Sequence, residues 1–292
     1  MEVIDRMKAS FSASTMLMKI IWVNIGVFVV LRLVAVVSMF MANGALLNFV
    51  MGLVELPSNL LILATRPWTV VTYMFAQFDV LHILFNMLWL WWFGTLFRMA
   101  CTPRQMLALY IYGGLGGAAL FLLAYATLPL FAYRAGTLIG ASASVMAIVT
   151  ATAILMPDFR MHLFLIGGVS LKWIAIATIG LVLIGVTGDN AGGEIAHAGG
   201  IAVGAWYALR LKKGHDITLP LCRFFDWCVN TWNRLTTPRP KAKPAYTDPD
   251  PKISRRDQRD LDEILDKVKR SGYSALTPEE RKRLFDISNN IK

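Results

Sequence analysis

The stretch LHILFN at residues 81–86 places a histidine and an asparagine in a run, 80–97, that is otherwise almost wholly apolar. Two further stretches repeat this pattern: GASAS at 140–144 contains a serine, and AHAGG at 196–200 contains a histidine. Burying a polar group in hydrocarbon costs free energy, so the polar residues that remain in such runs usually have a function. The three stretches therefore predict membrane-embedded helices that hold reactive side chains.

The composition of the whole chain agrees with this interpretation. Of 292 residues, 56% are hydrophobic and only 16% are charged, and the mean hydropathy is +0.52. These values are far from those of soluble globular proteins. We therefore expect an all-α fold, a polytopic membrane domain of six transmembrane helices over residues 1–213. A span needs about 20 apolar residues, and long apolar runs recur at 20–42, 80–97, 106–131, 142–156, 171–187 and 195–209.

The distribution of charge predicts how the chain lies in the membrane. The net charge of +10 comes largely from basic residues in one set of connections, and by the positive-inside rule these connections are cytoplasmic. Both termini are then cytoplasmic, as an even number of spans requires. We attribute the positive charge to this orientation and expect no nucleic-acid partner. The basic residues concerned are Lys8, Lys19, Arg98, Arg104, Arg160, Lys172, Arg210, Lys212 and Lys213.

His82 and Asn86 are four residues apart in the second run, so on a helix they share one face, one turn apart. Both side chains donate hydrogen bonds, and together they are suited to stabilise a developing oxyanion. The alternative is that the two polar side chains hold neighbouring helices together. The spacing alone favours neither role.

The fourth apolar run predicts a helix that starts below the membrane surface. Between Ser142 and Pro157 there are about 15 residues, or roughly 22 Å of helix, which is less than a hydrocarbon core of about 30 Å. Ser142 is then expected at a helix N-terminus, where unpaired backbone N–H groups and the helix dipole favour negative charge. Ser144 lies two residues further on and points away from Ser142. For either serine, the alternative is a role in helix packing.

The sixth apolar run supplies a base, His197. Rows of small residues flank His197 on this run and Ser142 on the fourth, and such rows allow membrane helices to approach closely. A serine–histidine hydrogen bond across two helices requires that approach, so the pattern predicts a dyad of Ser142 and His197. We expect Asp189 and Glu194 to be solvated loop residues and not a third member of the site. The rows are Ala196, Gly200, Gly204 and Ala208, and Ala143, Ala147 and Ala151.

Taken in this order, the motifs resemble those of the rhomboid family of intramembrane serine proteases. The resemblance covers most of residues 60–210 and includes His-x-x-x-Asn at His82 and Asn86, Gly-x-Ser at Ser142, and Ala-His-x-x-Gly-x-x-x-Gly at His197. It implies a rhomboid-like six-helix bundle in which Ser142 attacks a peptide bond while His197 acts as general base and then general acid. It also implies an oxyanion hole formed by His82, Asn86 and the backbone N–H of Ser142.

The resemblance has further implications. Rhomboids use no metal or cofactor, and they cleave single-pass or polytopic transmembrane proteins in or near the segments that lie in the lipid bilayer. A rhomboid of the bacterial type is expected in the cytoplasmic (inner) membrane. We expect Gly140, Gly200 and Gly204 to serve helix packing near the site. One departure from the family pattern is Gln77, which stands where a histidine is common.

After residue 213 the chain changes character. Residues 214–253 combine an amphipathic segment, expected to lie in the membrane interface, with a proline-rich linker. Residues 254–292 predict a small cytoplasmic helical hairpin, because Thr277, Pro278 and Glu280 fit a capping box. Such a hairpin is too small for a substantial core, so we expect it to dock or to bind a partner. The tail of this chain resembles those of some bacterial rhomboids.

Three functions are compatible with the polar residues in the apolar runs. The first is an active intramembrane serine protease. The second is a catalytically weak or inactive rhomboid-like protein that binds membrane-protein clients, which loss of Ser142 or His197 would have favoured. The third is a transporter or channel, whose halves are usually repeated, and the sequence contains no internal repeat.

Overall fold

The computed structural model describes residues 14–42, 44–163, 167–188, 190–236 and 255–290. The contacts between residues divide the chain into two units, Met1–Asn230 and Thr231–Lys292. The domain boundaries predicted from the sequence, after residues 213 and 253, lie on either side of this division.

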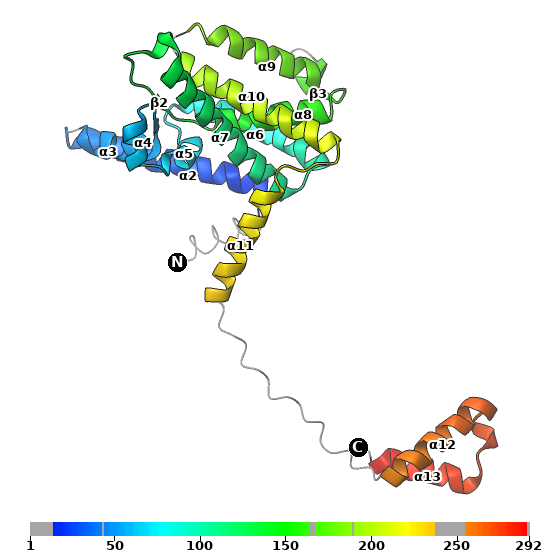
Figure 1. The fold of residues 1–292 in the computed structure, drawn as a ribbon. Coiled ribbons are helices and arrows are strands. Elements are labelled where there is room, and N and C mark those ends of the chain that lie inside the picture. The colour runs from blue at the N-terminus through cyan, green and yellow to red at the C-terminus, as the bar shows by residue number, and fades with distance from the viewer. Residues whose placement is uncertain (1–13, 43, 164–166, 189, 237–254, 291–292) are drawn as a thin grey trace. The chain divides into compact units, whose positions relative to one another are not determined.

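Helices form at all six of the predicted apolar runs in the first unit (Figure 1). By length and composition, three of the described helices are able to cross a membrane, namely α2, α6 and α7, whereas α8 and part of α9 are shorter apolar helices. The all-α fold class and the helical bundle are confirmed, and the number of six spans stays a prediction. The six helices are α2 (Met16–Phe40), α6 (Val80–Ala100), α7 (Pro103–Thr127), α8 (Ser142–Leu155), α9 (Leu171–Gly185) and α10 (Ala191–Lys212).

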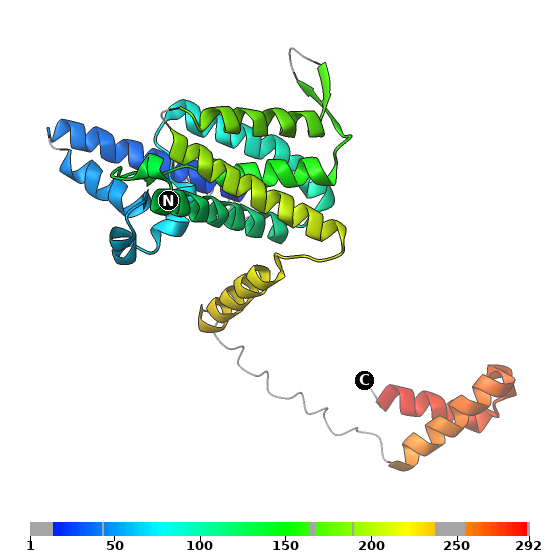
Figure 2. The same cartoon turned by 45° about the horizontal axis from the view of Figure 1, so that its top comes forward.

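Helix α8 lies in the middle of the bundle. It contacts α6, α7, α9 and α10, and most of its residues are buried. Figures 1 and 2 show α10, in yellow-green, running alongside α7 and α8. The two reactive side chains predicted on α8 and α10 are thus brought to one interface.

Side-chain caps fix where the helices begin. The Asp79 carboxylate caps α6 by accepting a hydrogen bond of 2.8 Å from the backbone N–H of His82. The start of α7 has a capping box between Thr102 and Gln105, with Pro103 at the first helical position. The cap of α6 thus bonds the backbone of His82, in the first turn of the helix.

Short elements fill the connection between α2 and α6. The end of α3 is held by three side-chain donors: Arg66, Trp68 and Thr72 bond the carbonyls of its last three residues at 2.7, 2.9 and 3.2 Å. These bonds satisfy carbonyls that a helix end leaves unpaired. The elements are α3 (Ala45–Val54), β1 (Leu56–Pro57), α4 (Leu60–Thr65), α5 (Thr69–Thr72) and η1 (Tyr73–Phe75).

Two small antiparallel strand pairs interrupt the helical fold, and neither was predicted. Strand β2 (Thr137–Leu138) pairs with β1, and this ties the connection between α7 and α8 to the one between α2 and α6. A short helix, η2 (Pro129–Phe131), precedes β2. On the connection between α8 and α9, β3 (Arg160–Leu163) pairs with β4 (Gly167–Ser170).

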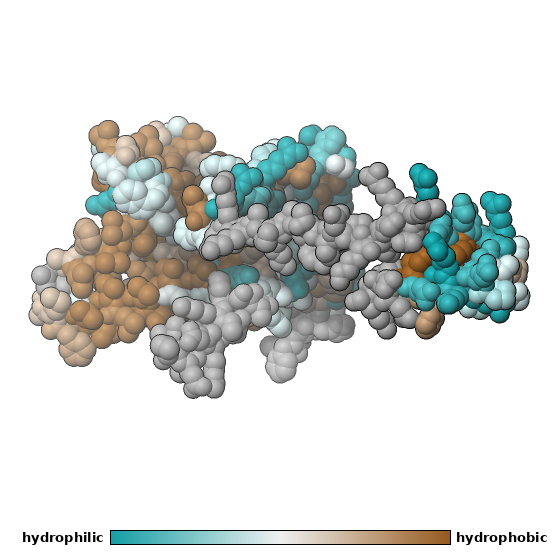
Figure 3. Space-filling view, turned by 90° about the horizontal axis from the view of Figure 1, so that it is seen from below, coloured by the Kyte–Doolittle hydropathy of each residue, from teal (hydrophilic) through white to brown (hydrophobic). Residues whose placement is uncertain are grey.

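The two units differ in surface character. Figure 3 shows hydrophobic surface over much of the first unit and mainly hydrophilic surface over the helices of the second. Large apolar side chains on the outside of α2, α6 and α9 are exposed, among them Val30, Leu81 and Leu181. An apolar exterior of this extent is typical of a surface that faces lipid.

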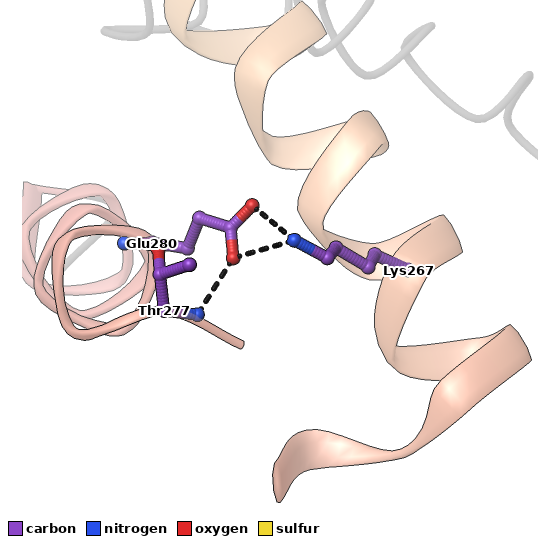
Figure 4. Close-up of polar contacts among 3 residues, drawn as sticks. All are labelled: Lys267, Thr277 and Glu280. Carbon is purple, nitrogen blue, oxygen red and sulfur yellow. Dashed lines mark hydrogen bonds and ion pairs between the residues drawn. The ribbon is translucent and has the colours of Figure 1, made fainter. Parts of the chain in front are cut away.

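The second unit contains the predicted helical hairpin, made of α12 (Arg255–Ser271), η3 (Tyr273–Ala275) and α13 (Pro278–Asn290). The capping box at the start of α13 is confirmed: Thr277 N–H donates to the Glu280 carboxylate at 2.8 Å, and Glu280 N–H donates to Thr277 Oγ1 at 3.3 Å. Lys267 of α12 donates to the same carboxylate (Figure 4). That hydrogen bond lowers the pKa of Glu280 below its ordinary value.

Candidate active site

Ser142 and His197 form a hydrogen bond between two helices. Ser142 is the first residue of α8, and its Oγ lies 2.6 Å from Nε2 of His197 on α10. The His197 side chain is 16% exposed, so the pair is only partly open to solvent. Because α8 begins at Ser142, the backbone N–H of Ser142 is one of those that have no partner within the helix.

Glycine residues allow α8 and α10 to approach closely enough for this bond. A β-carbon built on Gly200 would overlap the carbonyl oxygen of Ala143, and one built on Gly204 would overlap that of Ala147. The two rows of small residues predicted on α8 and α10 therefore face each other, and the backbones of the two helices are in direct contact there. Any larger residue at Gly200 or Gly204 would push α10 away from α8 and lengthen the serine–histidine bond.

Gly140 shapes the turn that leads into Ser142. Its φ angle of +134° lies in a region that L side chains rarely adopt. Its backbone N–H donates to the carbonyl of Tyr73 at 3.0 Å, which anchors the turn to η1. A β-carbon at this position would come within 3.0 Å of Cε1 of His82 and 3.7 Å of Oγ of Ser142. Gly140 is thus the point at which His82 and Ser142 approach each other.

Asn86 belongs to a buried chain of amides that the sequence did not reveal. Its Nδ2 donates to Oε1 of Gln77 at 2.7 Å, and Nε2 of Gln77 donates to Oδ1 of Asn24 at 3.1 Å. Asn24 in turn donates to the Tyr110 hydroxyl, at 3.1 Å, which donates to the carbonyl of Met74 at 2.7 Å. The amide group of Asn86 carries a second N–H donor besides the one bonded to Gln77. One sign of this hydrogen-bonded chain in the sequence is Asn24, a polar residue in the first apolar run.

Glu194 was expected to be a solvated loop residue, and this prediction is wrong. Glu194 lies in the first turn of α10, and its Oε2 is 2.9 Å from Nδ1 of His197. Its side chain is 22% exposed. The expectation failed because Gly192 and Gly193 favour a loop, whereas α10 already begins at Ala191 and includes both glycines. Asp189 lies outside the described residues.

Ser144 lies on a different face of α8 from Ser142. Its side chain is fully buried, and its Oγ has no hydrogen-bond partner among the described residues. A β-carbon on Gly114 of α7 would come within 2.9 Å of this oxygen, so Ser144 points toward α7. Ser144 is therefore not next to a base.

The arrangement is chemically suited to acyl transfer. A serine hydroxyl bonded to an imidazole nitrogen is an activated nucleophile, and the N-terminus of α8 with His82 supplies donors for an oxyanion. Within the described parts of the chain, no group of three or more His, Cys, Asp or Glu residues is arranged to hold a metal ion.

Comparison with known proteins identifies two regions. The model of the rhomboid domain matches residues 64–214, and that of a family of unknown function (DUF6576) matches residues 254–290. The mitochondrial RHOMBOID-like protein 12 of Arabidopsis thaliana is 31% identical over 202 residues, which is 65% of this chain and 56% of that protein. The mitochondrial presenilin-associated rhomboid-like protein A of Danio rerio is 29% identical over 184 residues, 60% of this chain and 44% of that protein.

A mammalian relative matches in the same way. The mitochondrial presenilin-associated rhomboid-like protein of Homo sapiens is 27% identical over 175 residues, which is 57% of this chain and 42% of that protein. The chain thus spans about half the length of these relatives. The rhomboid domain itself covers more than half of the 292 residues, including Ser142, His197, His82 and Asn86. With the helical bundle and the order of its motifs, this match means that the chain belongs to the rhomboid family.

Proposed function

We propose that this rhomboid is an intramembrane serine endopeptidase that cleaves membrane-anchored proteins in or near their transmembrane segments. The observation that supports this most directly is the 2.6 Å hydrogen bond between Ser142 Oγ and His197 Nε2. A serine that serves only helix packing does not require a histidine from another helix at this distance. Because both groups lie at the α8–α10 interface, a substrate would meet them inside the bundle.

The reaction follows from the positions of these groups. As Ser142 Oγ attacks the carbonyl carbon of the substrate peptide bond, its proton passes to Nε2 of His197. The oxyanion is stabilised by the N–H of Ser142, by His82 and by the second amide N–H of Asn86. The C–N bond then breaks, and His197 returns the proton to the leaving amine. Water, activated by the same histidine, hydrolyses the acyl-enzyme and regenerates Ser142.

Fluorophosphonate labelling and cleavage of a model transmembrane substrate test this function. Wild type should be labelled and should cleave, whereas Ser142→Ala should lose both properties. Ser144→Ala is the matched control, because it removes a hydroxyl from the same helix two residues away, and it should keep both. Activity that survives Ser142→Ala, or is lost only in Ser144→Ala, would contradict the assignment.

A wild-type protein that neither labels nor cleaves, yet still binds transmembrane proteins, would instead be the inactive client-binding rhomboid. No feature of the site favours that alternative, since both reacting residues are present and bonded.

We also propose that both termini are cytoplasmic and that the protein resides in a bacterial cytoplasmic membrane. The excess of basic residues on alternate connections supports this orientation. The relatives compared are named as mitochondrial proteins. Expected partners are the lipid bilayer and transmembrane protein substrates, with a further partner for the tail.

A further inference from the structure

His197 has hydrogen-bond partners on both sides of its ring. Nε2 lies 2.6 Å from Ser142 Oγ, and Nδ1 lies 2.9 Å from Glu194 Oε2. Glu194 and His197 are three residues apart in the first two turns of α10, so their side chains lie on the same face of the helix. The three groups therefore form a continuous chain from carboxylate to imidazole to hydroxyl.

The Glu194 side chain is confined on the side facing α9. A β-carbon built on Gly185, the last residue of α9, would lie 2.7 Å from Cδ of Glu194 and 2.8 Å from its Cγ. The absence of a side chain at Gly185 provides the space that the Glu194 carboxyl occupies. Two helices thus hold the carboxylate against His197.

A carboxylate at Nδ1 determines which tautomer of the neutral imidazole is present. An ionised carboxylate only accepts hydrogen bonds, so Nδ1 must carry the ring proton. Nε2 then has a free lone pair and accepts the proton of Ser142 Oγ. In a partly buried site, a nearby negative charge also stabilises the imidazolium that forms when Nε2 takes that proton.

We propose that Glu194 is a positioning residue for His197. Its carboxylate holds the imidazole in the Nδ1–H tautomer, with Nε2 toward Ser142, and stabilises the imidazolium during attack. No proton passes to Glu194 during the reaction. The effect of Glu194 on the rate of peptide-bond cleavage rests on the proposed protease function, whereas its effect on the tautomer of His197 does not.

A purely structural role for Glu194 has to be distinguished from this one. An acidic residue in the first turn of a helix interacts favourably with the helix dipole, and that alone accounts for a glutamate at this position. Glu194→Gln separates the roles, because it keeps an acceptor oxygen for Nδ1–H but removes the charge. Glu194→Leu removes both, and Glu194→Asp keeps the charge on a shorter side chain.

The first test does not depend on activity. The full chain, labelled with ¹⁵N-histidine and reconstituted in micelles, should give a His197 signal with Nδ1 protonated and Nε2 unprotonated at neutral pH. The signal is assigned by its loss in His197→Gln. Glu194→Gln should keep this tautomer, and Glu194→Leu should lose it. An Nε2–H tautomer in wild type, or an unchanged spectrum in Glu194→Leu, would overturn the proposal.

The second test is kinetic and includes a matched pair of glycine variants. General-base catalysis is worth about 10²–10⁴ in rate, so Glu194→Leu should lower kcat for a transmembrane substrate at least about tenfold with KM little changed. Glu194→Gln should fall between Glu194→Leu and wild type. Gly185→Ala should lower kcat by crowding Glu194, while Gly180→Ala, whose β-carbon would meet nothing within 4 Å, should not.

The two tests also separate this inference from the proposed function. Equal kcat in wild type, Glu194→Gln and Glu194→Leu, with cleavage that still requires Ser142, would overturn the role of Glu194 alone. Absence of Ser142-dependent cleavage in wild type would overturn the protease function, and the histidine spectrum would still decide the role of Glu194 in setting the tautomer.

Discussion

At the scale of single residues, the site depends on side chains that do not react. Gln77 accepts the hydrogen bond of Asn86, and it is itself held by Asn24 of α2. All three side chains are buried, so a broken bond would leave an unpaired amide in the interior. The orientation of Asn86 is thereby fixed by a residue nine positions earlier and by a different helix.

Substitutions at Asn86 and Gln77 should slow turnover without unfolding the protein. Removing one oxyanion-hole donor costs about 10²–10³ in kcat, and we expect Asn86→Ala to fall in that range. Gln77→Leu should cause a smaller loss, because Asn86 remains but is free to rotate. Substrate cleavage and thermal unfolding in detergent measure the two effects, with the exposed Asn233→Ala as control. Unchanged turnover in both variants would leave these residues a packing role only.

The contact between Ser142 and His197 could be predicted from the sequence, but the contact between Glu194 and His197 could not. Ser142 and His197 stand out because polar groups are rare in apolar helices. Glu194 does not stand out in this way, because Gly192 and Gly193, which precede it, each lower helix propensity by about 1 kcal/mol and suggest a loop. Tertiary packing overrides that preference: a β-carbon on Gly192 would come within 3.0 Å of the Tyr125 ring, so glycine lets α10 begin in close contact with the aromatic side chains of α7.

At the scale of helices and strands, the contact between α8 and α10 sets the geometry of the site. The rows of small residues predicted this contact because their spacing matches the helical repeat. The β1–β2 pair could not be predicted, since each strand has only two residues and so short a segment has no periodic pattern. That pair nevertheless joins the two connections from which Tyr73 and Gly140 come.

Gly200→Ala should destabilise the bundle and reduce activity together. The new methyl group would overlap the Ala143 carbonyl, and overpacking of this kind costs about 1–3 kcal/mol. We expect a lower unfolding temperature in detergent and slower fluorophosphonate labelling of Ser142. Gly180→Ala, in the apolar helix α9, is the control and should be at least as stable as wild type. If the Gly200→Ala protein were as stable and as reactive as wild type, α8 and α10 would have to lie further apart than the contact between Gly200 and Ala143 indicates.

At the scale of the whole molecule, helix α11 (Leu219–Thr236) continues the chain beyond the bundle and runs across the division between the two units. It is amphipathic. One face has Phe224, Trp232 and Leu235, which are 54, 67 and 79% exposed, and the opposite face has basic and amide side chains. On the polar side, Asp226 forms an ion pair of 2.9 Å with Arg104 at the start of α7.

Such a helix is expected to lie in the interface on the cytoplasmic side of the bilayer. The aromatic face would enter the boundary between headgroups and acyl chains, and the basic residues would remain among the headgroups.

Nitroxide labels at residues 232 and 233 test this position of α11 in bilayer nanodiscs, in a variant in which Cys222 and Cys228 are replaced by serine. The two positions are neighbours in the chain but lie about 100° apart on the helix, so each is the control for the other. We expect the label at 232 to be accessible to oxygen dissolved in lipid and the label at 233 to a water-soluble nickel complex. Equal access of the nickel complex to both labels would mean that α11 lies in water, and the exposed aromatic face would then require a protein partner instead of a membrane.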